Sequence, residues 1–290
     1  MTCYPKKIDL HIHSKISDGT DTPSEILQKV KGLGIELFSI TDHDAIKAAQ
    51  IISRELRDDS PAFITGVEFS CRDENGKYHI LGYSYDPSEK AVMDIVQKAH
   101  DYRMEKLTSR LNFLKSEFGI TFPQNEIDTL LRQENPGKPH IGKLMVKCGF
   151  ASTKEEAISE YLNKGDFIGR YVRPEEAING ILAGGGIPVL AHPSFGSGNQ
   201  LITGTEMDKR LSRLTELGLQ GAECFYSGFS RELINEMLDF AKKYDLYITA
   251  GSDYHGANKT VALGHTNHPD VSDYPAGLIR FFRRVLADIK

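Results

Sequence analysis

Short apolar runs alternate with helix-forming segments along most of this chain, and this alternation constrains its fold more than any other feature. Each run is a few residues long and rich in Ile, Leu, Val, Phe and Tyr, as buried parallel strands are. We predict seven strands, at residues 8–13, 37–41, 62–69, 78–84, 187–191, 221–225 and 246–250. Strands separated by helices imply right-handed parallel units, closed as a barrel or open as a doubly wound sheet.

The helices have recognisable signals. Thr22 is the expected N-cap of the first helix, with Pro23 at its first position and Glu25 completing a capping box. Further helices are predicted at 45–57, 174–183, 206–217, 231–244 and 276–288. Residues 88–169 have helical periodicity without a clear strand, so we predict a helical insertion subdomain there, covering the C-terminal face of a barrel domain formed by 1–87 and 170–290.

Composition excludes several classes of protein. The 290 residues include 35 Lys and Arg against 40 Asp and Glu, and the net charge of −5 gives no reason to expect a long duplex nucleic acid as partner. The four cysteines form no CxxC pair, and the N-terminus shows no signal-peptide core, so we expect a cytoplasmic protein. Residues 177–205 lack Asp, Glu, Lys and Arg, but their seven glycines and two prolines predict loop and strand rather than a membrane span.

Histidines and carboxylates cluster at the ends of the predicted strands. His11 and His13 are two residues apart on one strand, so their side chains face the same side. Further such residues at or near strand ends are Asp18, His43, Glu68, His79, His192, Glu223, Asp253 and His255. Sites of α/β barrels are built at that end of the strands, and buried carboxylates and imidazoles need a cation between them. Mixed nitrogen and oxygen donors suit Mn, Fe or Zn, so the pattern predicts a metal centre.

The set of motifs resembles the PHP (polymerase and histidinol phosphatase) family. The matching segments are Asp9-x-His11-x-His13, Thr41-Asp42-His43, Gly66-Val67-Glu68, His79, Ala191-His192-Pro193 and Ser252-Asp253-x-His255. The insertion after His79, which contains Pro139-His140, resembles a subgroup of nucleotide phosphatases and short-RNA 5′-3′ exonucleases. The resemblance implies a distorted (β/α)7 TIM-like barrel, two to three divalent metal ions, Mn first among them, and hydrolysis of phosphate esters.

The resemblance also implies roles for individual residues. His11, His13, Glu68 and Asp253 would hold a first metal, Glu68, His79 and His192 a second with Glu68 bridging, and Asp18, His43 and His255 a third. A metal-bound water held by Glu68, Asp18 and His255 would attack phosphorus. Among the neighbours of these residues, Asp9 and Asp42 are candidates for orienting imidazoles and Asp44 for capping the following helix.

Basic residues of the insertion and beyond are candidates for binding the substrate: Lys138, His140, Arg170 and Arg173. Where the family often has Arg-Pro-His, this chain has Lys138-Pro139-His140, and lysine lacks the bidentate fork of arginine.

Several functions remain open at this stage. We expect a phosphoesterase acting on 3′,5′-bisphosphonucleotides, nucleoside monophosphates or short oligoribonucleotides. The alternatives are a histidinol-phosphate phosphatase and a non-catalytic metal-binding module. A metal amidohydrolase is disfavoured by the spacing of Glu68 and His79 and by the lack of a lysine motif for a carbamylated bridge. The oligomeric state is left open.

Overall fold

The computed structural model describes residues 4–165, 169–195 and 201–287. Within these residues the strands form two sheets, one of three strands in the order β1–β2–β3 and one of five in the order β4–β5–β6–β7–β8. The strands are β1 (Ile8–Ile12), β2 (Leu37–Ile40), β3 (Ala62–Phe63), β4 (Gly66–Asp73), β5 (Gly76–Tyr83), β6 (Ile187–Leu190), β7 (Gly221–Tyr226) and β8 (Tyr247–Gly251).

The strand directions correct the expected (β/α)7 barrel. The three-stranded sheet and the β6–β7–β8 part of the larger sheet are parallel, as predicted, but β5 runs antiparallel to both β4 and β6. The predicted strand 62–69 is two strands, because β3 ends at Phe63 and β4 begins at Gly66. A turn at Glu74-Asn75 joins β4 to β5, and it is too short for the helical crossover that a parallel pair requires. The described residues therefore form a mixed α/β fold in which the antiparallel β5 interrupts the series of parallel β/α units.

Isolated backbone bridges connect the two sheets next to the predicted metal ligands. Ile12 pairs with Tyr254 just beyond β8, and His43 pairs with Glu68 of β4. The backbone N–H of Asp253 donates to the carbonyl of His11 at 2.8 Å, and that of Glu68 donates to Asp42 at 3.2 Å. The segments that carry the predicted ligands are thus joined directly.

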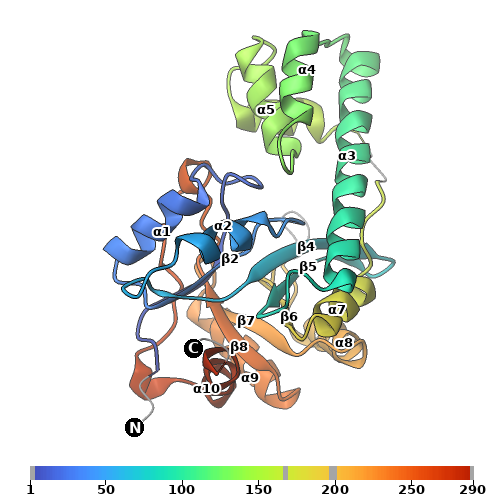
Figure 1. Ribbon diagram of the computed structural model, residues 1–290. Coiled ribbons are helices and arrows are strands. Elements are labelled where there is room, and N and C mark those ends of the chain that lie inside the picture. Colours follow the sequence, from blue (N-terminus) through green and yellow to red (C-terminus); the bar gives the residue numbers. More distant parts are fainter. Residues whose placement is uncertain (1–3, 166–168, 196–200, 288–290) are drawn as a thin grey trace.

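Helices follow most of the parallel strands (Figure 1). They are α1 (Pro23–Gly32), α2 (Lys47–Glu55), α7 (Pro174–Ala183), α8 (Gly204–Glu216), α9 (Arg231–Lys243) and α10 (Ala276–Leu286), with 3-10 turns at Gly256–Asn258 and Val271–Asp273. The predicted capping box is confirmed, since Glu25 N–H donates to Thr22 Oγ1 at 3.3 Å and Thr22 N–H donates to the Glu25 carboxylate at 2.7 Å. The predicted end of the last helix, residue 288, lies outside the described residues.

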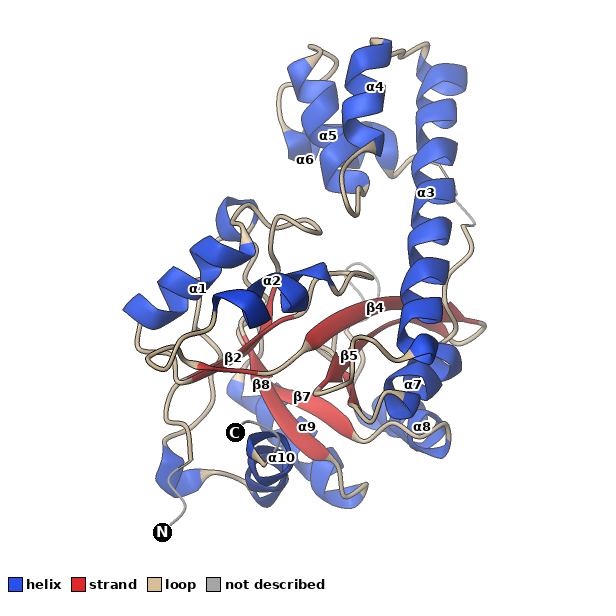
Figure 2. Cartoon of the chain, in the orientation of Figure 1, coloured by secondary structure: helices blue, strands red, loops and turns tan. Residues whose placement is uncertain are grey.

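The segment after β5 is helical, as its periodicity predicts. The 29-residue helix α3 (Lys90–Phe118) starts against α7 and runs away from the sheets, as Figures 1 and 2 show. At its far end lie α4 (Gln124–Leu131), α5 (Lys138–Lys147), α6 (Lys154–Glu156) and a π-helical turn (Ala157–Leu162). Leu107, Leu114, Ile141 and Met145 belong to a hydrophobic cluster separate from that of the sheets. The division into two domains remains a prediction.

In the part of the chain that the structure describes, no helix is long and apolar enough to cross a membrane.

Candidate metal centre

All nine predicted metal ligands converge where the two sheets meet. His11 and Glu68 lie on β1 and β4, and His79 lies on β5. The remaining six follow strands or lie in the loops after them: His13, Asp18, His43, His192, Asp253 and His255. Three overlapping groups have ligand atoms within 4.8 Å of one another, namely His13, Asp18, His43 and His255; His11, His13 and Asp253; and His43, Glu68 and His79.

The Glu68 carboxylate lies among five imidazole rings and is only 1% exposed. Its Oε1 atom lies 2.8 Å from His79 Nδ1 and 3.2 Å from His192 Nε2. Its Oε2 atom lies 3.0 Å from His43 Nδ1, 3.1 Å from His13 Nε2 and 3.4 Å from His11 Nε2. Each carboxylate oxygen therefore faces its own set of rings, which is the arrangement that a bridging ligand requires.

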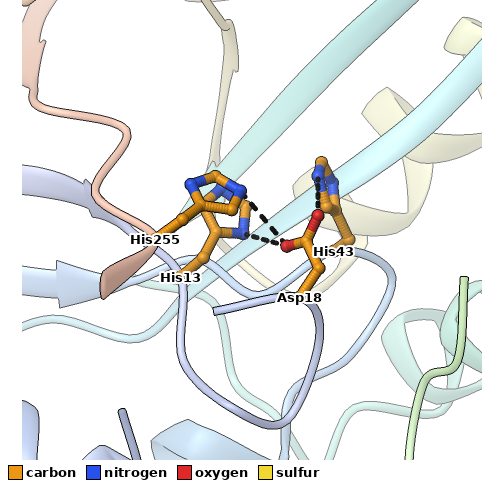
Figure 3. Close-up of side chains that lie close together, drawn as sticks. All are labelled: His13, Asp18, His43 and His255. Atoms are coloured by element: carbon orange, nitrogen blue, oxygen red, sulfur yellow. Dashed lines mark ion pairs between the residues drawn. The ribbon is translucent and has the colours of Figure 1, made fainter. Parts of the chain in front are cut away.

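Two aspartates complete the groups on either side of His13. Asp18 Oδ1 lies 3.2 Å from His255 Nε2 and 3.7 Å from His13 Nδ1, and Asp18 Oδ2 lies 3.9 Å from His43 Nε2 (Figure 3). Asp253 Oδ1 lies 3.4 Å from His13 Nε2 and 3.7 Å from His11 Nε2. Each aspartate thus faces at least two imidazole nitrogens.

The donor atoms fit divalent cations. The Nε2 atoms of His11 and His13 lie 3.1 Å apart, a distance at which two unprotonated nitrogens repel unless a cation or proton separates them. His43 Nδ1 and Glu68 Oε2 are buried and lie 3.0 Å apart, yet among the residues the structure describes neither atom has a partner in hydrogen-bonding geometry. Buried polar atoms left in this way cost free energy that a metal ion would remove. Imidazole and carboxylate donors suit Mn, Fe and Zn, and the geometry sets neither the number nor the identity of the ions.

Electrostatics within the group differ from ring to ring. Burial and the neighbouring His13 lower the pKa of His255 to about 4, so its ring is neutral. Its Nδ1 lies 2.8 Å from the Asp253 carbonyl, which assigns the proton to Nδ1 and leaves Nε2 to face Asp18. Burial alone would raise the pKa of the Asp18 carboxyl, but the neighbouring His43 holds that pKa well below its usual range.

Glu223 orients one of the rings. Its Oε1 lies 3.0 Å from His11 Nδ1, and its Oε2 accepts from the backbone N–H of His192 at 2.7 Å. The carboxylate therefore selects the tautomer of His11 that has a free lone pair on Nε2, the atom that faces Glu68. Such partners of metal-binding histidines fix ring orientation and raise ligand basicity.

We expect a Glu223→Gln variant to bind metal about ten- to a hundredfold more weakly than the wild type, because the amide cannot select that tautomer as reliably. Titration of chelator-treated protein with Mn²⁺ measures the change, and excess metal should restore activity. Unchanged Mn²⁺ affinity would remove this role from Glu223.

Two other buried aspartates accept hydrogen bonds from serine hydroxyls and backbone N–H groups. Asp9 accepts from Ser252 N–H at 3.0 Å and from Ser252 Oγ at 2.6 Å, and burial raises its pKa to about 6. Asp42 accepts from Ser14 Oγ at 2.6 Å and Ser17 Oγ at 2.7 Å, which fixes the loop that carries Asp18. Asp9 and Asp42 were predicted to orient imidazole rings, and the hydrogen bonds that the structure describes for them go to serines and other backbone groups instead.

The capping role predicted for Asp44 is wrong. The N-cap of α2 is Ile46, which makes no side-chain capping bond. Asp44 instead accepts from Ser70 N–H at 2.9 Å and forms an ion pair with Arg103 of α3. Asp44 has a left-handed φ of +50°, and its backbone N–H donates to the carbonyl of Glu68 at 2.9 Å, so this residue links β4 to α3.

Backbone conformation also shapes the centre. A Cβ atom at Gly251 would lie 2.2 Å from His11 Cβ and 2.3 Å from Glu223 Oε1, so only glycine fits beside this pair. His192 and Asp253 have φ values of +29° and +57°, a region that non-glycine residues seldom adopt. Such strain is typical of residues held in place for function.

The predicted substrate residues separate into two sets. Lys138 lines a cavity of about 430 Å³ that also reaches Asp18, His43, His79 and His192. His140 Nδ1 accepts from Gly137 N–H at 3.0 Å at the start of α5. Arg170 forms an ion pair with Glu105, and Arg173 lies 3.1 Å from Glu175; both arginines are exposed and neither lines this cavity.

Sequence reasoning missed five other cations that line the cavity: Lys77, Arg103, Lys106, Arg110 and Arg210. Three of them are spaced by three and four residues along α3, which places them on one face of that helix. This spacing is visible in the sequence. It indicates a binding site, however, only when the position of α3 in the fold is known.

Comparisons with known proteins show which proteins this chain resembles. Residues 9–133 match the family model of the PHP domain. The chain is 28% identical over 267 residues to a 5′-3′ exoribonuclease of Haemophilus influenzae, covering 89% of this chain and 93% of that protein. It is 28% identical over 269 residues to a 3′,5′-nucleoside bisphosphate phosphatase of Chromobacterium violaceum, covering 89% and 91%. A crystal structure from Bifidobacterium adolescentis, of a protein provisionally described as a metal-dependent phosphoesterase, is 25% identical with a TM-score of 0.78 and covers 98% of this chain and 97% of that one.

Proposed function

Because the chain carries a PHP domain and is a phosphoric ester hydrolase of the PHP type, we propose that it hydrolyses small nucleotides or short oligoribonucleotides. The nucleotides would be 3′,5′-bisphosphonucleotides or nucleoside monophosphates. One observation carries the proposal: the Glu68 carboxylate and its five imidazoles adjoin a cavity of about 430 Å³ lined with Lys and Arg. That volume lies in the range of small-ligand sites.

We assign the metal-binding role to the nine convergent residues, His11, His13, Asp18, His43, Glu68, His79, His192, Asp253 and His255. Two or three divalent ions, with Mn the first choice, would neutralise phosphate oxygens, lower the pKa of a water and stabilise the leaving oxygen. Glu68, Asp18 and His255 would hold the metal-bound attacking water, and the 3.2 Å between His255 Nε2 and Asp18 Oδ1 supports grouping the last two.

The protein's own cations would bind and orient the substrate. Lys and Arg side chains in the cavity attract phosphate, and the aromatic rings of Tyr78 and Tyr171 share its lining. Tyr171 is the more exposed of the two and would offer aromatic surface to the sugar or base, whereas Tyr78 is 3% exposed and lies under the Arg210 guanidinium. A positively charged lining disfavours histidinol phosphate, whose amino group and imidazole would carry positive charge into the same cavity.

A substrate panel tests the proposal. We expect chelator-sensitive release of phosphate from 3′,5′-bisphosphoadenosine, or of nucleotides from a short 5′-phosphorylated RNA, when Mn²⁺ is supplied. AMP and histidinol phosphate serve as comparison substrates. Preferential hydrolysis of histidinol phosphate would contradict the nucleotide assignment, and no turnover of any substrate by the metal-loaded protein would favour a non-catalytic metal-binding module.

A further inference from the structure

We use the term basic wall for five cationic side chains that line the cavity, namely Lys77, Lys106, Arg110, Lys138 and Arg210. We propose that the basic wall binds a second phosphate group of the same substrate, one that is not hydrolysed. The proposal rests on the proposed function and names what that function leaves open, namely the group that selects the substrate.

The basic wall is assembled from separate parts of the fold. Lys77 comes from β5, Lys106 and Arg110 from α3, Lys138 from the start of α5 and Arg210 from α8. These side chains line one cavity together with His43, His79 and His192 of the candidate metal centre. A molecule bound in this cavity can therefore contact both groups of side chains.

Lys106 is the clearest member of the basic wall. It is only 8% exposed, and its Nζ lies 3.6 Å from the centre of the Tyr171 ring. Across the ranges that the structure describes, it forms no ion pair with a carboxylate. Burial, reinforced by Arg103 and Arg110, lowers its pKa to about 7. A buried cation without a counter-ion is costly, and a bound dianion would offset that cost.

Lys138 also lacks a carboxylate partner within the described part of the chain. Its Nζ donates to the neutral amide oxygen of Asn163 at 2.7 Å. Burial, reinforced by Arg110 and Lys77, lowers its pKa to about 8. The guanidinium of Arg210 lies 4.4 Å from the centre of the Tyr78 ring and donates to the carbonyl of Lys77 at 3.3 Å.

Neighbouring cations behave differently. Arg103 forms an ion pair with Asp44, Arg213 lies 2.7 Å from Asp73, and Arg170 pairs with Glu105. The fold thus supplies carboxylates to cations around the cavity and leaves Lys106 and Lys138 without them among the described residues. Such unneutralised charge, facing the same cavity as a metal centre, fits a phosphate better than a neutral ligand.

The test compares a substrate with two phosphate groups to one with a single phosphate. In Lys106→Met, we expect KM for 3′,5′-bisphosphoadenosine to rise about ten- to a hundredfold, the effect of losing a charged contact. We expect KM for AMP to rise at least about fivefold less than KM for 3′,5′-bisphosphoadenosine, because a single phosphate held at the metal centre leaves the basic wall without a second phosphate to bind. Lys90→Met is the matched control on the same helix, since Lys90 is exposed and pairs with Asp94 at 2.5 Å, and it should change nothing.

Folding of the variant can be checked separately. Methionine keeps the length of the side-chain stem that packs against Gly169, and the substitution removes a buried charge. The groups that surround the Lys106 ammonium are Arg103, Arg110, Lys77, Asp44 and Tyr171. In this environment the pKa of Lys106 is about 7, against 10.5 for an ordinary lysine. The unfolded chain therefore binds this proton more tightly, and wild-type stability rises from about pH 7 to about pH 10.5. The Tm advantage of Lys106→Met should be largest below pH 7 and vanish toward pH 10.5.

Two results would overturn the proposal: an equal change for both substrates in Lys106→Met, or no change for either. Lys138→Met provides a second variant with the same expected selectivity. Calorimetric binding of 3′,5′-bisphosphoadenosine to chelator-treated protein, with inorganic phosphate as competitor, gives a readout without turnover. If the wild type hydrolyses nothing, the proposed function fails, but weaker binding by both variants would still support the phosphate site. Equal binding by wild type and variants would contradict it.

Discussion

A Glu68→Gln variant will lose metal and at least roughly a thousandfold of the wild-type kcat. The glutamine side chain has the same shape, so the packing around this residue is kept. It lacks the negative charge, however, and directs an N–H₂ group at imidazole nitrogens that lie 2.8–3.4 Å from the carboxylate oxygens. Because both oxygens serve separate sets of rings, more than one ion should be lost. Metal content by mass spectrometry and single-turnover phosphate release measure the two effects.

The matched control for this variant is Glu105→Gln. Glu105 is an exposed carboxylate of α3 that pairs with Arg170, so its loss should leave metal content and kcat unchanged. Glu68→Gln protein with wild-type turnover in saturating Mn²⁺ would remove Glu68 from the reaction.

A Gly251→Ala variant tests the geometry of the centre without removing any ligand. The added methyl group would lie 2.2 Å from His11 Cβ and 2.3 Å from Glu223 Oε1. His11 and Glu223 must therefore move away from residue 251. Overpacking of this kind costs about 1–3 kcal/mol of stability. Displacing His11 should also lower Mn²⁺ affinity and reduce kcat by roughly a hundredfold. Thermal unfolding and Mn²⁺ titration measure the two effects.

Gly32→Ala is the control for this substitution. Gly32 ends α1, and an added Cβ there meets nothing within 4 Å. We expect unchanged activity and equal or slightly greater stability, because alanine lowers the entropy of the unfolded chain. If Gly251→Ala behaves like this control, the close contact with His11 is not needed for the site.

The sequence groups many of the candidate ligands because these residues follow parallel strands, whereas Glu68 and His79 lie within the antiparallel β4–β5 pair. The spacing of His11 and His13 places both rings on one face, and parallel strands gather their C-terminal ends at one edge. Helix starts are equally local, since the capping box at Thr22 involves residues three apart. The antiparallel β4–β5 pair was missed because apolar runs carry no strand direction, although Asn75-Gly76 was a readable turn signal.

The residues around the centre were harder to predict. Lys106 and Arg170 are both basic residues in or next to the insertion. Lys106 is only 8% exposed and lines the cavity, whereas Arg170 is at the surface and pairs with Glu105. The placement of α3 against α7 separates them, and that placement depends on long-range packing. Asp44 shows the same limit, because its partner Arg103 lies 59 residues away.

The most direct test of the whole account is phosphate release from 3′,5′-bisphosphoadenosine by the wild-type protein before chelation, after chelation and after Mn²⁺ is returned. We expect turnover that disappears with the metal, returns with it and saturates at two or three ions per chain. Turnover that is unaffected by complete removal of bound metal would contradict the assignment of the histidine and carboxylate cluster as the catalytic metal centre.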